Sequence, residues 1–192
     1  MEKSKIGMII HKKLESYLKQ TKILFGEELY LKHKNRIRNI DLIVVTEYPN
    51  YNHLTNKVYS LKYEKLLKKI IKSIGMQINH DTLIFPILEH TPEFSRSPLE
   101  KEVEEFKTKL KLCIRLNRPK MIIGFGKTVG KSLIGESIPF EEMRSTNYQF
   151  EEIPIKITYD PFSILNNSDY KRPLWIDLKL IRDYLSSKNI DE

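Results

Sequence analysis

Short apolar runs alternate with amphipathic stretches along most of this sequence. Residues 41–46 (DLIVVT) and 121–125 (MIIGF) are almost continuously apolar, whereas residues 62–74 repeat Leu and Ile at helical spacing and are followed by Gly75. A strand without polar alternation must be buried on both faces, as in a parallel sheet that helices cover. The pattern predicts an α/β fold, a three-layer α/β/α sandwich around a central, mainly parallel sheet of four strands.

The expected elements also indicate where ligands would bind. The predicted strands are residues 41–46, 82–88, 121–125 and 155–158, and the predicted helices are residues 6–24, 62–74, 99–116, 128–133 and 174–185. A chain of 192 residues can bury one sizeable core, so we expect a single domain over residues 1–192, with a helical segment, residues 1–40, packed on it. In such folds ligands bind beyond the carboxyl ends of the strands. The corresponding loops are residues 47–50, 88–97, 126–128 and 159–166.

The charge balance favours a polyanionic partner. The sequence has 33 Lys and Arg against 25 Asp and Glu, a formal net charge of +8. Clustered cations neutralise phosphates and release counterions, which favours nucleic acid. A second explanation is compositional, because the sequence is rich in Lys, Ile and Asn and has no Ala. The positions of the cations must therefore decide between the two.

Cysteine and histidine usage argues against a bound metal or cofactor. A single cysteine, Cys113, excludes an internal disulfide and a cluster held by several thiolates, and fits a reducing, cytoplasmic setting. His11, His33, His53 and His80 show no metal-ligand spacing. No apolar run approaches the roughly 20 residues that span a bilayer. We expect a monomer without cofactor, metal or membrane contact.

Three blocks at the predicted strand ends carry a resemblance to a known family. They are residues 44–50 (VVTEYPN), residues 96–127, which include RSP and RPKMIIGFGK, and residues 153–178, which include TYDP and KRPLWIDL. In this order the blocks resemble the uracil-DNA glycosylase superfamily, and most closely its iron–sulfur branch, called family four. The resemblance implies a DNA partner, base flipping and excision of a base to leave an abasic site.

The departures from the family pattern bear on cofactor and substrate. Two positions that match cluster cysteines are His90 and Phe106, so no iron–sulfur cluster is expected. The position that matches the uracil-reading asparagine is Pro86, and the position of the motif histidine is Asp160. Proline cannot read the edge of uracil, because it lacks an amide that donates and accepts.

The resemblance also implies residue roles. Glu47 would orient or deprotonate the attacking water, and Asp160 would face the departing base. Base-binding residues would be Tyr48, Asn50, Tyr59 and Pro86. DNA-binding residues would be Arg96, Ser97, Lys171 and Arg172, a phosphate grip formed by Gly126, Lys127 and Thr128, and an apolar wedge formed by Phe162, Ile164 and Leu165. Structural roles stand beside these: a turn for Glu47, core packing for Tyr59 and the wedge residues, a tight turn for Gly126, and solvated charge for the cations.

The two carboxyl groups suggest a hypothesis about the substrate. An ionised Asp160 would repel the base oxygen that becomes negative, unless burial or Glu47 raised its pKa and kept it protonated. A carboxyl pair suits a cytosine-type leaving group, so we expect a modified pyrimidine, such as the hydroxymethylated or glucosylated cytosine of phage DNA, and a role in anti-phage defence. The alternatives are a conventional uracil-DNA glycosylase in base-excision repair, an inactive glycosylase-fold DNA-binding module, and an unrelated α/β enzyme acting on a nucleotide or sugar.

Overall fold

The computed structural model describes residues 40–48, 57–88 and 96–188. By its contacts the chain divides into two units, Met1–Arg38 and Asn39–Glu192, and all described residues belong to the second. The expected helix over residues 6–24 and the expected packing of residues 1–40 lie outside the described residues.

The sheet confirms the predicted α/β architecture and adds one strand to it. Its spatial order is β2-β1-β3-β5-β4. Strands β1, β2, β3 and β5 run parallel, and β4 pairs antiparallel with β5 at the edge. The strands are β1 (Leu42–Thr46), β2 (Thr82–Pro86), β3 (Met121–Phe125), β4 (Tyr148–Phe150) and β5 (Ile153–Thr158). The prediction of four strands was therefore one short, because β4 has only three residues.

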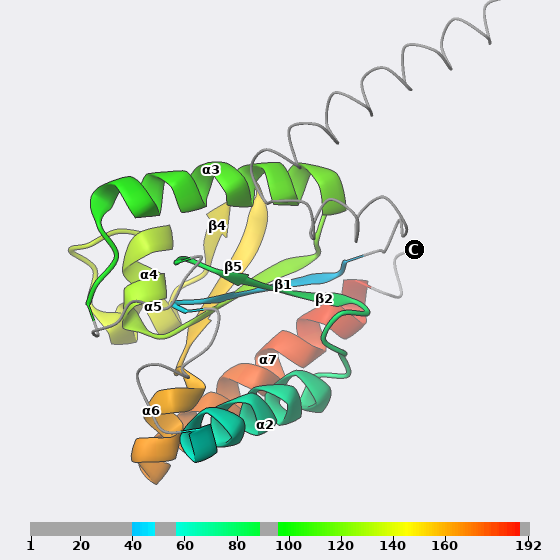
Figure 1. Cartoon of the computed structure of the whole chain (residues 1–192). Coiled ribbons are helices and arrows are strands. Elements are labelled where there is room, and N and C mark those ends of the chain that lie inside the picture. The colour runs from blue at the N-terminus through cyan, green and yellow to red at the C-terminus, as the bar shows by residue number, and fades with distance from the viewer. Residues whose placement is uncertain (1–39, 49–56, 89–95, 189–192) are drawn as a thin grey trace, which may run out of the picture. The chain divides into compact units, whose positions relative to one another are not determined.

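Helices cover both faces of this sheet. Figure 1 shows α2 and α7 on one face and α3, α4 and α5 on the other. The helices are α2 (Lys57–Ser73), α3 (Glu100–Asn117), α4 (Lys127–Leu133), α5 (Phe140–Ser145), α6 (Pro161–Asn166), the short 3₁₀ helix η1 (Ser168–Tyr170) and α7 (Lys171–Lys188). None of the described helices is long and apolar enough to cross a membrane.

The core explains why the apolar runs form strands. All residues of β1 and β3 are buried. On the face covered by α2 and α7, Val44 and Ile123 pack with Ile71 and Ile181 in one apolar cluster. The two central strands are thus fixed by burial on both sides, and their carboxyl ends are held at one edge of the sheet.

One expected loop is a helix instead. Residues 161–166 form α6, which begins with Asp160 as its N-cap and Pro161 as its first residue. Asp at the N-cap and Pro at the first helical position are both preferred, since one accepts from a free backbone N–H and the other has no N–H to satisfy. The segment after β5 is therefore rigidly built.

Candidate active site

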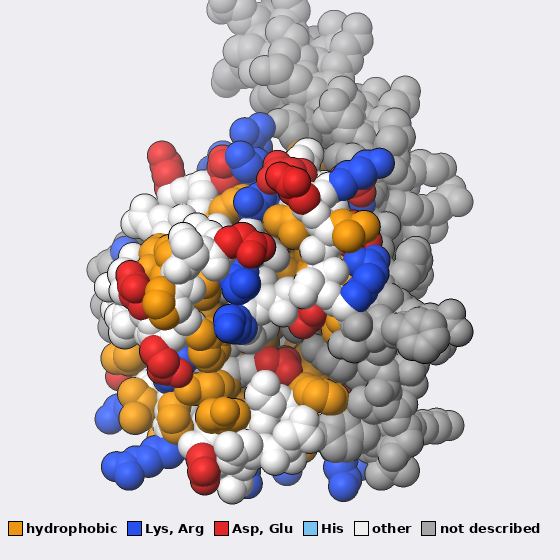
Figure 2. Space-filling view, turned by 90° about the vertical axis from the view of Figure 1, so that its left-hand side faces the viewer, with side chains coloured by type: hydrophobic (Ala, Val, Ile, Leu, Met, Phe, Trp, Pro, Cys, Tyr) orange, Lys and Arg blue, Asp and Glu red, His pale blue; other side chains and the backbone are white. Residues whose placement is uncertain are grey.

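Three parallel strands end beside one another at the edge where the chemistry was expected. Glu47 follows β1, Gly126 follows β3 and Asp160 comes two residues after the end of β5, and these three strands are neighbours in the order β1-β3-β5. Figure 2 looks onto this end of the molecule, where acidic and basic side chains are interspersed with hydrophobic ones and do not form a single positive stripe. The sheet thus brings together Glu47 and Asp160, the two predicted catalytic residues.

Glu47 is half-buried and held from several sides. Its backbone carbonyl accepts a hydrogen bond from Leu88 N at 3.1 Å, which ties it to the segment after β2. Burial raises the pKa of its carboxyl, and side-chain hydrogen bonds with Tyr48 and Thr128 oppose that rise. Glu47 is therefore a carboxyl group with fixed partners and a pKa shifted toward neutrality, as a general base needs.

Asp160 combines a structural and an electrostatic position. Its Oδ2 accepts a hydrogen bond from Phe162 N at 2.9 Å, which caps α6. Burial raises the pKa of its carboxyl from 3.8 to about 7; hydrogen bonds from the backbone of Phe162 and Ser163 lower it in part, and the nearby charge of Glu47 raises it further. Near neutral pH a large share of Asp160 is thus protonated and able to donate.

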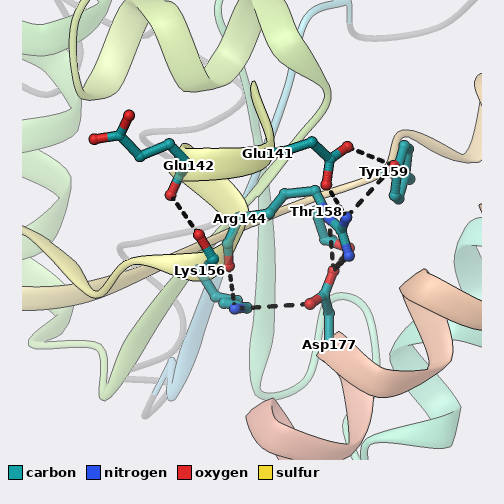
Figure 3. Close-up of polar contacts among 8 residues, drawn as sticks. Glu141, Glu142, Arg144, Lys156, Thr158, Tyr159 and Asp177 are labelled. Carbon is teal, nitrogen blue, oxygen red and sulfur yellow. Dashed lines mark hydrogen bonds and ion pairs between the residues drawn. The ribbon is translucent and has the colours of Figure 1, made fainter. Parts of the chain in front are cut away.

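The residue two positions before Asp160 is anchored to a buried acid on α7. Thr158 Oγ1 donates to Asp177 Oδ2 at 2.6 Å, and Arg144 Nη2 lies 3.0 Å from the same oxygen. Lys156 Nζ lies 3.6 Å from Asp177 Oδ1 and also donates to the carbonyl of Arg144. Figure 3 shows these side chains converging on Asp177. With 4% of its surface exposed, Asp177 is the buried counter-charge that ties β5, α5 and α7 together.

Tyr159, the second residue of the TYDP motif, belongs to the same network. Its hydroxyl donates to Glu141 Oε1 at 2.8 Å, and its ring stacks on Tyr170 with 4.4 Å between centroids. The guanidinium of Arg144 lies 4.3 Å from the centre of the Tyr159 ring, a cation–π contact. Thr158 and Tyr159 thus hold the segment in place, while Asp160 follows them at the edge.

This network was missed in the sequence, although a signal was present. Asp177 lies among Leu174, Leu178, Ile181 and Leu185, which form the buried stripe of α7. An acid at a core position of an amphipathic helix needs a buried partner, because an unpaired charge there is very costly.

The predicted base-binding residues fall into three groups. Pro86 is the last residue of the edge strand β2, where it pairs in register with Thr46. Tyr48 is 4% exposed, and its hydroxyl donates to the carbonyl of Arg96 at 3.0 Å. Tyr59 lies in the first turn of α2, but its side chain and the whole of Asn50 are outside the described residues. Contact of any of them with a base remains a prediction.

Among the predicted DNA contacts, three cations and Ser97 lie at the surface. Lys127 begins α4, Lys171 and Arg172 begin α7, and all three are exposed, as is Ser97. Arg96 is also at the surface, but both its terminal nitrogens lie 2.7 Å from the carboxylate of Glu102. This pairing lowers the pKa of Glu102 to about 2. The charge of Arg96 is therefore already compensated by a carboxylate of the same chain.

The predicted phosphate grip is partly used by the protein itself. The N–H of Gly126 donates to the carbonyl of Thr158 at 2.8 Å, which extends the pairing of β3 with β5. The side chain of Thr128 hydrogen-bonds with Glu47. Thr128 thus has a hydrogen-bond partner within the protein, and phosphate contacts of this turn remain a prediction.

The predicted apolar wedge is part of a packed helix. Ile164 is 4% exposed and lies in the apolar core, and Phe162 and Leu165 pack against that core from α6. Entry of Ile164 into DNA would require its side chain to leave the core. Insertion of Ile164, Phe162 and Leu165 stays a prediction.

The residues present do not fit the iron–sulfur cluster of the branch that the sequence resembles. The sequence has a single cysteine, and Cys113 is buried in α3. Phe106, at a position that matches a cluster ligand, packs against Phe85 with ring centroids 5.8 Å apart. Over the described ranges, no three His, Cys, Asp or Glu side chains are grouped so that they could hold a metal ion.

The fold and this edge define an α/β protein with paired carboxyl groups at the carboxyl ends of the strands of a mainly parallel sheet. The family model "Uracil DNA glycosylase superfamily" matches residues 33–179, a range that contains all three sequence blocks. The chain therefore belongs to the uracil-DNA glycosylase superfamily, a superfamily of DNA glycosylases. Comparison with curated proteins gives no match.

Proposed function

We propose that this DNA glycosylase excises a modified pyrimidine other than plain uracil, with a cytosine that carries a hydroxymethyl or glucosyl substituent as the favoured base. The abasic site left behind would disable phage DNA that carries such bases, which makes the biological role one of defence. The observation that carries the substrate proposal is the carboxyl pair, Glu47 and Asp160, in which Asp160 has a pKa of about 7.

The two carboxyl groups suit different parts of one reaction. Water adds to C1′ of the sugar, the C1′–N bond breaks, and the base leaves with the bonding electrons. The Glu47 carboxylate accepts the proton of the water and stabilises the cationic sugar. Protonated Asp160 donates to the base as negative charge develops on it.

The pair also bears on which base is accepted. A histidine or an amide at these positions would donate to the oxygens of uracil, whereas an acid that exchanges its proton near neutral pH can also accept from an exocyclic amine. Pro86, at the end of β2, offers neither donor nor acceptor from its side chain. Position 86 therefore supplies no amide that would select uracil against cytosine-type bases.

Abasic-site formation on a panel of DNA substrates tests the proposal. The panel contains uracil, unmodified, 5-hydroxymethylcytosine and glucosylated DNA, in single-stranded and duplex form, and alkali converts abasic sites into strand breaks. We expect strand breaks in DNA with modified cytosine. In Glu47→Gln the rate at which these breaks form should fall by about 10²-fold or more. Glu104→Gln is the matched control, because Glu104 lies on α3 and its side chain is 68% exposed.

The panel separates the alternatives. Breaks confined to the uracil substrate would refute the modified-base proposal and identify a conventional uracil-DNA glycosylase. DNA binding without breaks on any substrate, unchanged in Glu47→Gln, would identify an inactive binding module.

A further inference from the structure

The hydroxyl of Tyr48 joins the candidate base Glu47 to a distant segment of the chain. It donates to the backbone carbonyl of Arg96 at 3.0 Å, across 48 positions of sequence. It also hydrogen-bonds with the side chain of Glu47. Since the ring is only 4% exposed, packing holds this hydroxyl in place.

The backbone around Glu47 is fixed as well. Thr46 Oγ1 donates to the carbonyl of Tyr48 at 3.0 Å, and Leu88 N donates to the carbonyl of Glu47 at 3.1 Å. The main chain therefore has little freedom there, and the carboxyl can move only by rotating about its own side-chain bonds. Among the described residues, the side chains of Tyr48 and Thr128 hydrogen-bond with the Glu47 carboxyl and oppose the rise in its pKa.

A phenol has one O–H and so cannot donate to both oxygens at once. When Glu47 is ionised, the O–H is best placed on its carboxylate, because a bond to a charged acceptor is stronger than one to a neutral carbonyl. When Glu47 is protonated, it can donate to the phenol oxygen, and the phenol O–H is free to donate to the carbonyl of Arg96.

We propose that Tyr48 is a positioning residue that holds Glu47 for catalysis and moves its O–H between the Glu47 carboxylate and the Arg96 carbonyl as Glu47 gains or loses its proton. This inference deepens the proposed function and rests on it for the kinetic effects. Among the described residues, Asp160 at the start of α6 interacts electrostatically with Glu47, and Arg96, paired with Glu102, interacts electrostatically with Tyr48.

Tyr48→Phe tests the proposal, because it keeps the ring and removes only the hydroxyl. Without this hydrogen bond the pKa of Glu47 rises, so the acid limb of the pH–rate profile moves to higher pH. The loss of one bond to a charged group predicts that kcat falls about tenfold or more, with KM little changed. Tyr184→Phe on α7, away from this edge, is the matched control and leaves the profile where it is.

A second measurement does not need activity. In the ¹³C NMR titration of the Glu47 carboxyl, we expect the midpoint to move to higher pH in Tyr48→Phe and to stay in place in Tyr184→Phe. An unchanged midpoint, or a fall in kcat with an unmoved acid limb, overturns the proposal. If the wild-type protein cleaves no DNA substrate, the proposed function fails, whereas the NMR shift still decides the role of Tyr48.

Discussion

Gly126 lies so close to Asp160 that a Cβ at position 126 would come within 3.2 Å of the Cβ of Asp160. The two residues follow neighbouring parallel strands, β3 and β5. Gly126 also has φ of +93°, a conformation that side chains with a Cβ rarely adopt. The turn after β3 thus sets the space in which the Asp160 carboxyl sits.

Gly126→Ala tests this relationship. The backbone strain predicts a loss of about 1–3 kcal/mol in the free energy of unfolding. The crowding displaces Asp160, so we expect glycosylase activity to fall further than the loss of folded protein explains. Urea unfolding and initial rates on the same preparation measure the two effects, and activity that falls only in step with stability would contradict the close packing.

The raised pKa of Asp160 predicts how stability depends on pH. The folded state binds the Asp160 proton more tightly than the unfolded chain does, since the pKa rises from 3.8 to about 7. The contribution of Asp160 protonation to the free energy of unfolding is fully present below about pH 4 and is lost as the pH rises through about 7. Burial raises the pKa of Glu47 and acts in the same direction.

Asp160→Asn isolates this contribution, because the amide still accepts the capping hydrogen bond but does not titrate. We expect the wild-type unfolding free energy to fall across this pH window by more than that of the variant. Parallel slopes for the two proteins in urea titrations at several pH values would show that Asp160 does not titrate there.

The central strands were predictable because burial on both faces leaves a continuous apolar run, as in β1. The edge strand β4 was not, since the three residues Tyr148–Phe150 are only partly buried and carry no such run. Helix α6 was taken for a loop although Asp160 and Pro161 are start signals, because its six residues show no clear period.

The loops that contain Glu47 and Asp160 could be located from the sequence because they follow recognisable strands, and the family resemblance singled out these two residues within the loops. The tertiary partners of the site could not. The bond of Thr128 to Glu47 and that of Tyr48 to Arg96 depend on how loops far apart in sequence meet. Asp177 could have been noticed from the sequence, because it is an acid on the apolar stripe of α7.

Asp177→Ala predicts a large loss of stability. The substitution leaves Arg144 and Lys156, whose side chains are 12% and 11% exposed, without their buried counter-charge. Removing one partner of a buried charge network costs about 3–5 kcal/mol. Asp183→Ala on the same helix is the control, since that side chain is 57% exposed and the change stays within about 0.5 kcal/mol. Equal melting curves for the two variants would contradict this account.

Cys113 predicts a simple report on unfolding. It is the single thiol of the sequence, it is 4% exposed, and burial raises its pKa to about 12. A thiolate is the reacting form, so we expect no labelling by a thiol reagent in the native protein and complete labelling in urea. The labelling transition should coincide with the loss of circular dichroism. Rapid labelling of the native protein would show that α3 opens locally.

Glu102→Gln predicts stronger and more salt-dependent binding to DNA. The substitution removes the negative charge that compensates the guanidinium of Arg96, whose terminal nitrogens are each 2.7 Å from the Glu102 carboxylate. One additional cation on a phosphate steepens the dependence of log K on log salt by about 0.9. Glu104→Gln is the control for net charge alone. Glu104 lies on the same helix, carries the same charge and pairs with Lys107 at 3.7 Å instead of with Arg96. Binding of a fluorescent duplex is measured at several salt concentrations for both variants. A slope that steepens only in Glu102→Gln places Arg96 on the DNA path, whereas equal slopes would show that it faces away from the phosphates.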